Sequence, residues 1–177
     1  IAIKQETNLP VIGIIKKEYP GFEGYITPTI KEVDELIKAK ADVIALDCTN
    51  QKRGDGLTVE EFITKIRLKY PNAILMADIS TYEEGMNAQD YGADIISTTM
   101  SGYTKYSLKA NEPDYELMYR LSHDCSIPVI GEGRIHTPKQ AIKAFDMGVW
   151  AIVVGGAITR PYEIAKRFVD AIDKQQY

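Results

Sequence analysis

A lysine and two carboxylates each follow an apolar segment of this 177-residue sequence. Lys16, Asp78 and Glu132 are the first ionisable side chains after those segments. If the segments are parallel strands, their carboxyl ends share one edge of a sheet, where functional side chains gather. A lysine among apolar neighbours is poorly solvated as an ammonium ion, so it can act as a base near neutral pH or form a Schiff base. Together with a nearby carboxyl group, it predicts proton transfer to and from a small substrate.

Each of these side chains also has a simpler interpretation. Lys16 or its neighbour Lys17 could point to solvent, and sequence parity does not decide which of them faces the site. Glu132 could form an ion pair with Lys16 or Arg134, although its position between two glycines favours a proton donor or acceptor. Asp78 could orient the lysine, bind a sugar hydroxyl or cap a helix.

The segment 151–161 has the build of a phosphate-binding turn. An apolar run leads into Gly155 and Gly156, and Arg160 precedes a proline that suits the first position of a helix. Glycines let backbone N–H groups approach an anion, while a helix start and an arginine supply further donors. Gly133, which follows the preceding apolar run, repeats the pattern. An ordinary glycine-rich turn is the alternative for this segment.

Six apolar runs alternate with amphipathic segments along the chain. The runs are continuous, as in buried parallel strands, and cover residues 11–15, 43–46, 73–77, 94–96, 128–130 and 151–154. Helices are predicted to begin near residues 29 and 81 and to cover 58–70, 114–123, 137–147 and 161–174, with left-handed caps at Gly92 and Gly148. Strict alternation predicts an α/β fold with a parallel sheet and right-handed crossovers.

The expected fold is a (β/α)8 TIM barrel. Such barrels often bind phosphate with the loops after their last two strands, where both glycine-rich turns lie. An open doubly wound sheet is the alternative, but the sequence has no GxGxxG turn after an early strand. A complete barrel usually needs upward of roughly 200 residues. We therefore expect residues 1–177 to form one phosphate-binding domain, strands three to eight of a barrel, with the first two strand–helix units missing from this chain.

Composition indicates one soluble globular domain. The chain is 45% apolar and 26% charged, with a formal net charge of -4. It has no block of basic residues, so we expect no nucleic acid and no membrane among its partners. Cys48 and Cys125 lie far apart in sequence, and we expect free thiols in a cytoplasmic protein. Cys48 follows a strand, where a nucleophile could act, but a small core residue is the favoured interpretation.

A divalent metal is the alternative use of the acidic strand ends, which include the weaker candidate Asp47. His123 and His136 are the only imidazoles, and His123 falls within a helical pattern, so a histidine-rich catalytic site is not expected. An all-oxygen magnesium site is the open alternative. We expect no catalytic metal.

The segment 98–107 is rich in hydroxyl and aromatic side chains. It includes Ser101, Gly102, Tyr103 and Thr104 and has too few apolar residues for a strand. It is expected to form a lid or a sugar-binding loop, with an exposed linker as the alternative.

Seven motifs run in order along essentially the whole chain. They are IGIIKK at 12–17, ITPT at 26–29 with KEVD at 31–34, IALD at 44–47, MADIS at 76–80, STT at 97–99 with SGYT at 101–104, GEGR at 131–134, and VGGAITRP at 154–161. Their combination resembles the bacterial N-acetylmannosamine-6-phosphate 2-epimerases. The resemblance implies a (β/α)8 barrel that interconverts N-acetylmannosamine 6-phosphate and N-acetylglucosamine 6-phosphate in sialic acid and amino-sugar catabolism. It also implies a homodimer and no required metal or nucleotide cofactor.

The resemblance implies roles for individual residues as well. Lys16 matches the family's catalytic lysine, which removes and returns the C2 proton of the sugar, Glu132 its catalytic carboxylate, and Asp78 its supporting acid. The implied phosphate contacts are Gly133, Gly155, Gly156 and Arg160, with Arg134 as a weaker candidate. Family members begin with two further strand–helix units that bring a glutamine and an arginine to the site, and the sequence lacks both.

Two other functions fit the same residues. A Schiff-base aldolase or lyase would use Lys16 covalently on a sugar phosphate. A non-catalytic barrel fragment would bind phosphosugars without acting on them.

Overall fold

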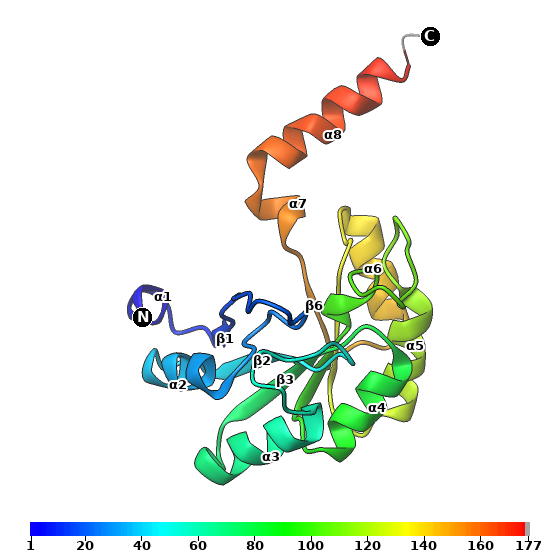
Figure 1. Ribbon diagram of the computed structural model, residues 1–177. Helices are drawn as coiled ribbons and strands as arrows, with labels where there is room; N and C mark the ends of the chain where they lie inside the picture. The colour runs from blue at the N-terminus through cyan, green and yellow to red at the C-terminus, as the bar shows by residue number, and fades with distance from the viewer. Residues whose placement is uncertain (176–177) are drawn as a thin grey trace.

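The protein forms a six-stranded parallel sheet in the computed structural model, which describes residues 1–175 (Figure 1). The strands are β1 (Ile12–Gly13), β2 (Val43–Asp47), β3 (Ile74–Asp78), β4 (Ile95–Ser97), β5 (Val129–Glu132) and β6 (Ala151–Val153). They lie in chain order, and each pairs in parallel with the next. All six predicted strands are present, and the order excludes the doubly wound alternative, whose strand order reverses within the sheet.

Helices connect the strands and cover one face of the curled sheet (Figure 1). They are α2 (Ile30–Lys38), α3 (Val59–Lys69), α4 (Tyr82–Asp90), α5 (Tyr115–Asp124) and α6 (Pro138–Asp146), with α1 (Ala2–Glu6) before β1 and α8 (Pro161–Asp173) after β6. Capping boxes begin four of them, at Thr29, Thr58, Thr81 and Thr137. The predicted left-handed caps are confirmed at Gly92 (φ +99°) and Gly148 (φ +90°). None of the helices within residues 1–175 is long and apolar enough to cross a membrane.

Two short elements were not predicted. A 3-10 turn, η1 (Thr98–Met100), continues directly from β4, and a four-residue helix, α7 (Gly156–Thr159), precedes α8. Neither element is long enough to show a hydrophobic periodicity in the sequence. Both follow strand ends, so they shape the edge of the sheet where the candidate residues lie.

Side chains alternate between two cores of unequal size. The larger core lies between the sheet and the helices and contains Leu46, Phe62 and Ile96. The smaller one gathers Val43, Ala45, Met76 and Ile130 on the other face. Because successive strand residues point to opposite faces, the positions two residues beyond those of the smaller core point the same way at the carboxyl edge of the sheet. These positions include Asp47, Asp78 and Glu132.

The described sheet is curled and open, as in part of a TIM barrel. β1 and β6 each pair with one strand among residues 1–175. Helix α8 extends away from the sheet and from the helices that cover it (Figure 1). Its Phe168 and Ile172 side chains are exposed. Two further units at the front of the chain are an expectation that the structure does not confirm.

Candidate active site

Strand register brings the acidic strand ends together. Asp47 of β2 pairs with Asp78 of β3, and Asp78 pairs with Ser97 of β4. Glu132 of β5 pairs with Val153 of β6 one strand further along. With the shared inner-face orientation, this register explains how Asp78 and Glu132, 54 positions apart in the sequence, reach one site.

Lys16 belongs to the same inner face, whereas Lys17 does not. Ile15 packs against the larger, outer core, so Ile14 and Lys16 face the opposite way. Lys16 pairs with Ile26 in an isolated antiparallel bridge, and its Nζ lies 5.8 Å from the centre of the Tyr25 ring. Its side chain is exposed, which corrects the expectation that apolar neighbours would desolvate it.

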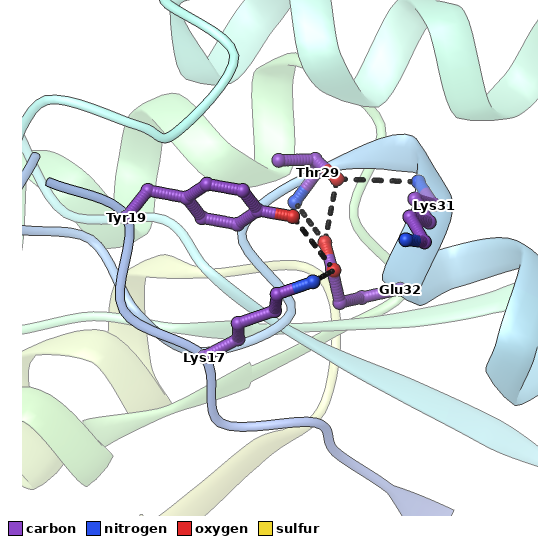
Figure 2. Close-up of polar contacts among 5 residues, drawn as sticks. All are labelled: Lys17, Tyr19, Thr29, Lys31 and Glu32. Atoms are coloured by element: carbon purple, nitrogen blue, oxygen red, sulfur yellow. Dashed lines mark hydrogen bonds and ion pairs between the residues drawn. The ribbon is translucent and has the colours of Figure 1, made fainter.

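Lys17 is bound on the helix-covered side, as Figure 2 shows. Its Nζ donates to Oε1 of Glu32 at 3.2 Å, and the hydroxyl of Tyr19 donates to the same oxygen at 2.9 Å. The other Glu32 oxygen accepts from the backbone N–H of Thr29 at 3.1 Å and from its hydroxyl at 2.5 Å. Burial alone would raise the pKa of Glu32, but the hydrogen bonds from Thr29, Tyr19 and Lys17 hold that pKa below its usual value. Lys17 therefore connects the segment after β1 to the first turn of α2.

One cavity of about 420 Å³ collects most of the predicted site residues. Lys16 and Glu132 line it, together with the phosphate-site candidates Gly133, Gly155, Gly156 and Arg160. Asp78 lies beneath it and is only 2% exposed. The structure thus brings a lysine, a carboxyl group and a glycine–arginine turn to one concave surface, as the barrel hypothesis predicted.

The two carboxyl groups meet at a threonine. The hydroxyl of Thr99 lies 2.6 Å from Oδ1 of Asp78 and 3.1 Å from Oε2 of Glu132. Ser97 donates to the same Glu132 oxygen at 3.3 Å. Two further hydrogen bonds join the hydroxyl of Thr98 to the Glu132 backbone, at 2.9 Å to the carbonyl and 3.0 Å from the N–H. The carboxyl edge of β5 is therefore held to β4 by three consecutive hydroxyl side chains.

Burial controls the charge of both acids. Desolvation raises the pKa of Asp78 well above its usual range, and the nearby charges of Glu132 and Asp47 raise it further. Desolvation also raises the pKa of Glu132. Thr99 and Lys16 act in the opposite direction on both groups. Such a pair suits acid–base work, because one carboxyl group stays protonated at a pH where an ordinary one would be charged.

The phosphate-site candidates surround the mouth of the cavity. Gly133 has φ +103°, a conformation that favours glycine. A Cβ on Gly156 would lie 3.2 Å from Oε2 of Glu163, whereas one on Gly155 would meet nothing within 4 Å. Arg160 donates to Oε1 of Glu163 at 2.7 Å through an exposed ion pair. Its guanidinium is thus held at the mouth by a partner that an anion can replace.

Arg134, the weaker phosphate candidate, supports a loop. Its Nε donates to the carbonyl of Glu112 at 2.7 Å, and its Nη1 donates to the carbonyl of Ser101. These bonds connect the β5 edge to the segment predicted as a lid. They also leave Glu132 without Arg134 as an ion-pair partner.

The segment 98–107 is held in place by hydrogen bonds of its own hydroxyl groups. Ser101 donates to Asp114 at 2.7 Å, and Thr104 donates to Ser80 at 3.0 Å. Ser80, Ser101 and Thr104 are all buried. Tyr103 alone of the four predicted contacts lines the cavity, and it is 60% exposed. Gly102 has φ +85° and its backbone N–H donates to Ser107. Most of the loop therefore positions Tyr103.

Other candidates have structural roles. Asp47 is buried and accepts from the backbone and hydroxyl of Thr49 at 3.0 and 2.6 Å. Thr81, not Asp78, caps α4. Burial raises the pKa of the Cys48 thiol, so this side chain is a core residue rather than a nucleophile. Across residues 1–175, no group of three or more His, Cys, Asp and Glu side chains is placed to hold a metal ion.

A second cavity of about 510 Å³ lies beside α3 and α4. Its charged lining includes Arg53 and Glu84, both of which are buried. Arg53 donates to the backbone carbonyls of Asp47 and Thr27, and Glu84 accepts from the backbone of Asn50. These groups hold loops together, and none of the acidic strand ends lines this cavity.

Several residues that line the smaller cavity were not singled out from the sequence, among them Tyr25, His136 and Glu163. Tyr25 comes from an irregular segment, His136 follows the β5 turn, and Glu163 lies in the first turn of α8. Tyr25 carries no signal in the sequence alone, because nothing before folding relates its segment to the strand ends. His136 was weighed only as a metal ligand, although its place just after the GEGR motif could have indicated a site position.

Comparisons with known proteins agree along the length of the chain. The family described as "Putative N-acetylmannosamine-6-phosphate epimerase" matches residues 1–174. A relative of that name from Caldanaerobacter subterraneus subsp. tengcongensis is 54% identical over 177 residues, which are all of this chain and 75% of the relative. A Clostridium perfringens relative is 52% identical over 170 residues, covering 96% of this chain and 76% of the relative.

A solved structure is similar as well. It is that of the N-acetylmannosamine-6-phosphate 2-epimerase from Clostridium perfringens, with a TM-score of 0.90 and 52% identity. The match covers 96% of this chain and 73% of that one.

Proposed function

Because the chain belongs to the N-acetylmannosamine-6-phosphate epimerase family, we propose that its inner-face cavity inverts C2 of N-acetylmannosamine 6-phosphate to give N-acetylglucosamine 6-phosphate. The protein is an isomerase, since these two sugars differ only in configuration at that carbon. The observation that carries the residue assignment is the meeting of Lys16, Glu132 and the Gly155–Arg160 turn at one cavity.

Lys16 is the base in this proposal. In the open-chain sugar, C2 lies beside the C1 aldehyde, so its proton becomes acidic when the carbonyl is polarised. The amine of Lys16 takes that proton, the C–H electron pair forms the C1=C2 bond, and the carbonyl oxygen takes a proton from Glu132. The enediol then turns over beside Lys16, the Lys16 ammonium returns its proton to the opposite face of C2, and the oxygen's proton returns to Glu132, which gives the other epimer with both side chains in their starting protonation states.

The phosphate group is bound at the other end of the cavity. Backbone N–H groups at the Gly155–Gly156 turn and the guanidinium of Arg160 supply donors, and Gly133 lets the β5 turn approach. When the phosphate binds, the Arg160 guanidinium leaves Glu163 and donates to the phosphate instead. Anchoring the phosphate fixes the position of C2 relative to Lys16, which is how binding energy far from the reacting carbon raises the rate.

In this proposal, the six strands β1 to β6 are strands three to eight of a (β/α)8 barrel. The parallel order, the inner-face polar cluster and the glycine turns after the last two strands support this assignment. The open edges of β1 and β6 are where two further strands would pair. The homodimer and the cytoplasmic location stay predictions, the second supported by two free cysteines.

The experiment follows both epimers of the sugar phosphate by NMR after addition of the purified protein. We expect the mannosamine signals to convert to glucosamine signals until both are present at equilibrium. Treatment with borohydride in the presence of substrate distinguishes the Schiff-base alternative, which would leave a sugar adduct on Lys16. Binding without conversion would support the non-catalytic alternative and would contradict the proposal.

A further inference from the structure

The hydroxyl of Thr99 occupies a position with more hydrogen-bond partners than it has protons. It lies 2.6 Å from Oδ1 of Asp78, 3.1 Å from Oε2 of Glu132 and 2.8 Å from Oγ of Ser97. A threonine hydroxyl has one proton to donate and two lone pairs with which to accept. If both carboxyl groups were charged, Thr99 could satisfy only one of them, and the other contact would place two oxygens together with no proton between them.

One additional proton resolves the arrangement. A proton on Asp78 lets that acid donate to Thr99, while Thr99 donates to a charged Glu132. A proton on Glu132 reverses the chain, so that Glu132 donates to Thr99 and Thr99 donates to a charged Asp78. Both forms satisfy the contacts of Thr99 with the two acids, and they differ in which acid carries the additional proton and in which way the threonine hydroxyl points.

We propose that Thr99 is a proton relay that lets Asp78 and Glu132 share one proton during epimerisation. Before the sugar oxygen is protonated, the shared proton lies on Asp78 and Glu132 is charged. The Asp78 O–H bond breaks as a new O–H bond forms on Thr99, the original Thr99 O–H bond breaks at the same time, and its proton passes to Glu132. The negative charge thus moves from the cavity wall to the buried aspartate. Glu132 then gives this one proton to the sugar oxygen and takes it back when the C1 carbonyl re-forms, so the number of protons is unchanged. This inference rests on the proposed function of the cavity.

The surroundings of Asp78 and Glu132 favour these two roles. Glu132 and Thr99 line the cavity, while Asp78 lies below it and reaches the cavity through Thr99. Lys16 acts on both acids and favours their charged forms, whereas Asp47 disfavours a charge on Asp78. The other charged or titratable residues that line the cavity are Tyr25, Tyr103, Arg134, His136, Arg160 and Glu163. Thr99 is thus a positioning residue that acts through Glu132.

The test compares Thr99→Val, which removes the hydroxyl with little change of shape, with Thr99→Ser, which keeps it. Thr49→Val is a matched control, because Thr49 also donates to a buried strand-end aspartate at 2.6 Å, that of Asp47, which does not line the cavity. We expect Thr99→Val to lower kcat roughly 10- to 100-fold, as for loss of a hydrogen bond to a charged group, with KM within about twofold of the wild type. Thr99→Ser and Thr49→Val should keep kcat within about threefold.

The pH profile separates a relay from a structural hydrogen bond. Because Thr99 lowers the pKa of both acids, its loss raises the protonated fraction of Glu132. At low pH solvent protonates Glu132 directly, so a variant that lacks only the relay regains kcat, whereas a lost structural hydrogen bond lowers kcat equally at every pH. We expect the ratio of Thr99→Val to wild-type kcat to rise toward one as the pH falls.

If the wild-type protein epimerises the sugar, any one of three results would contradict the relay. These are unchanged kcat in Thr99→Val, equal loss in Thr99→Ser and Thr99→Val, or a kcat ratio of Thr99→Val to wild type that does not change with pH. If Thr99→Val does not fold, as judged by circular dichroism, Thr99→Ala takes its place in each comparison. An inactive wild type would contradict the proposed function itself.

Discussion

Lys16 and Lys17, adjacent in sequence, lie on opposite faces of the sheet. Lys16 lines the inner cavity with Glu132, while Lys17 donates to Glu32 of α2 on the outer side. The alternation of a strand produces this division, because successive side chains point in opposite directions. Two identical residues are therefore placed for different roles, Lys16 for the proposed chemistry and Lys17 for a structural contact.

Removing the Lys17 amine should affect stability and not chemistry. Lys17→Met leaves Glu32 buried with hydrogen bonds from Tyr19 and Thr29 but without its cation. We expect a lower urea midpoint, with kcat unchanged. The raised pKa of Lys17, which comes first from Tyr19 and then from Glu32, adds a pH dependence. A group whose pKa is raised on folding contributes stability below its unfolded pKa and loses it as pH rises through the folded one, so the variant and the wild type should converge at strongly alkaline pH.

Asp78→Asn should stabilise the fold and impair the reaction. Folding raises the pKa of this buried acid, chiefly through desolvation. The contribution of Asp78 to stability is therefore present at low pH and lost as the pH rises through its folded pKa. We expect the variant to exceed the wild type in free energy of unfolding above that pH, by about 1.4 kcal/mol for each unit of pKa change. Urea unfolding from acid to mildly alkaline pH measures this, and a difference independent of pH would contradict it.

Arg160 and Glu163 should have opposite effects on phosphate affinity. Arg160→Ala removes a charged donor from the cavity mouth, and we expect KM to rise roughly 10- to 100-fold with a smaller change in kcat. Glu163→Gln removes the competitor that holds Arg160 in the free protein, so KM should fall or stay the same. Inhibition constants for inorganic phosphate should follow the same order. Equal KM values in Arg160→Ala and the wild type would remove Arg160 from the phosphate site.

Most of the fold could be predicted from the sequence. Capping boxes at Thr29, Thr58, Thr81 and Thr137 locate helix starts to within a residue, because the cap is a local hydrogen-bond pattern. The continuous apolar runs likewise locate six strands. The least accurate was β1, predicted for 11–15 and observed at Ile12–Gly13. Ile12 of this strand and Ile14 just after it are exposed, so apolarity there does not mark burial.

The site could be predicted only in part, since its details depend on contacts between distant segments. Lys16 and Glu132 were found because strand ends are local features of the sequence. The pairing of Arg134 with the loop carbonyls depends on residues 22 and 33 positions away, so the sequence could equally indicate a phosphate ligand. Tyr25 reaches the cavity through an irregular segment that no periodicity describes.

The central claim is that Lys16 moves the C2 proton. The most direct measurement is proton NMR of N-acetylmannosamine 6-phosphate in deuterated water with the wild type, Lys16→Ala and Lys17→Ala. We expect deuterium at C2 of the glucosamine product with the wild type and with Lys17→Ala, and neither exchange nor conversion with Lys16→Ala. Exchange at C2 by Lys16→Ala at the wild-type rate would contradict the account, because another group would then be the base.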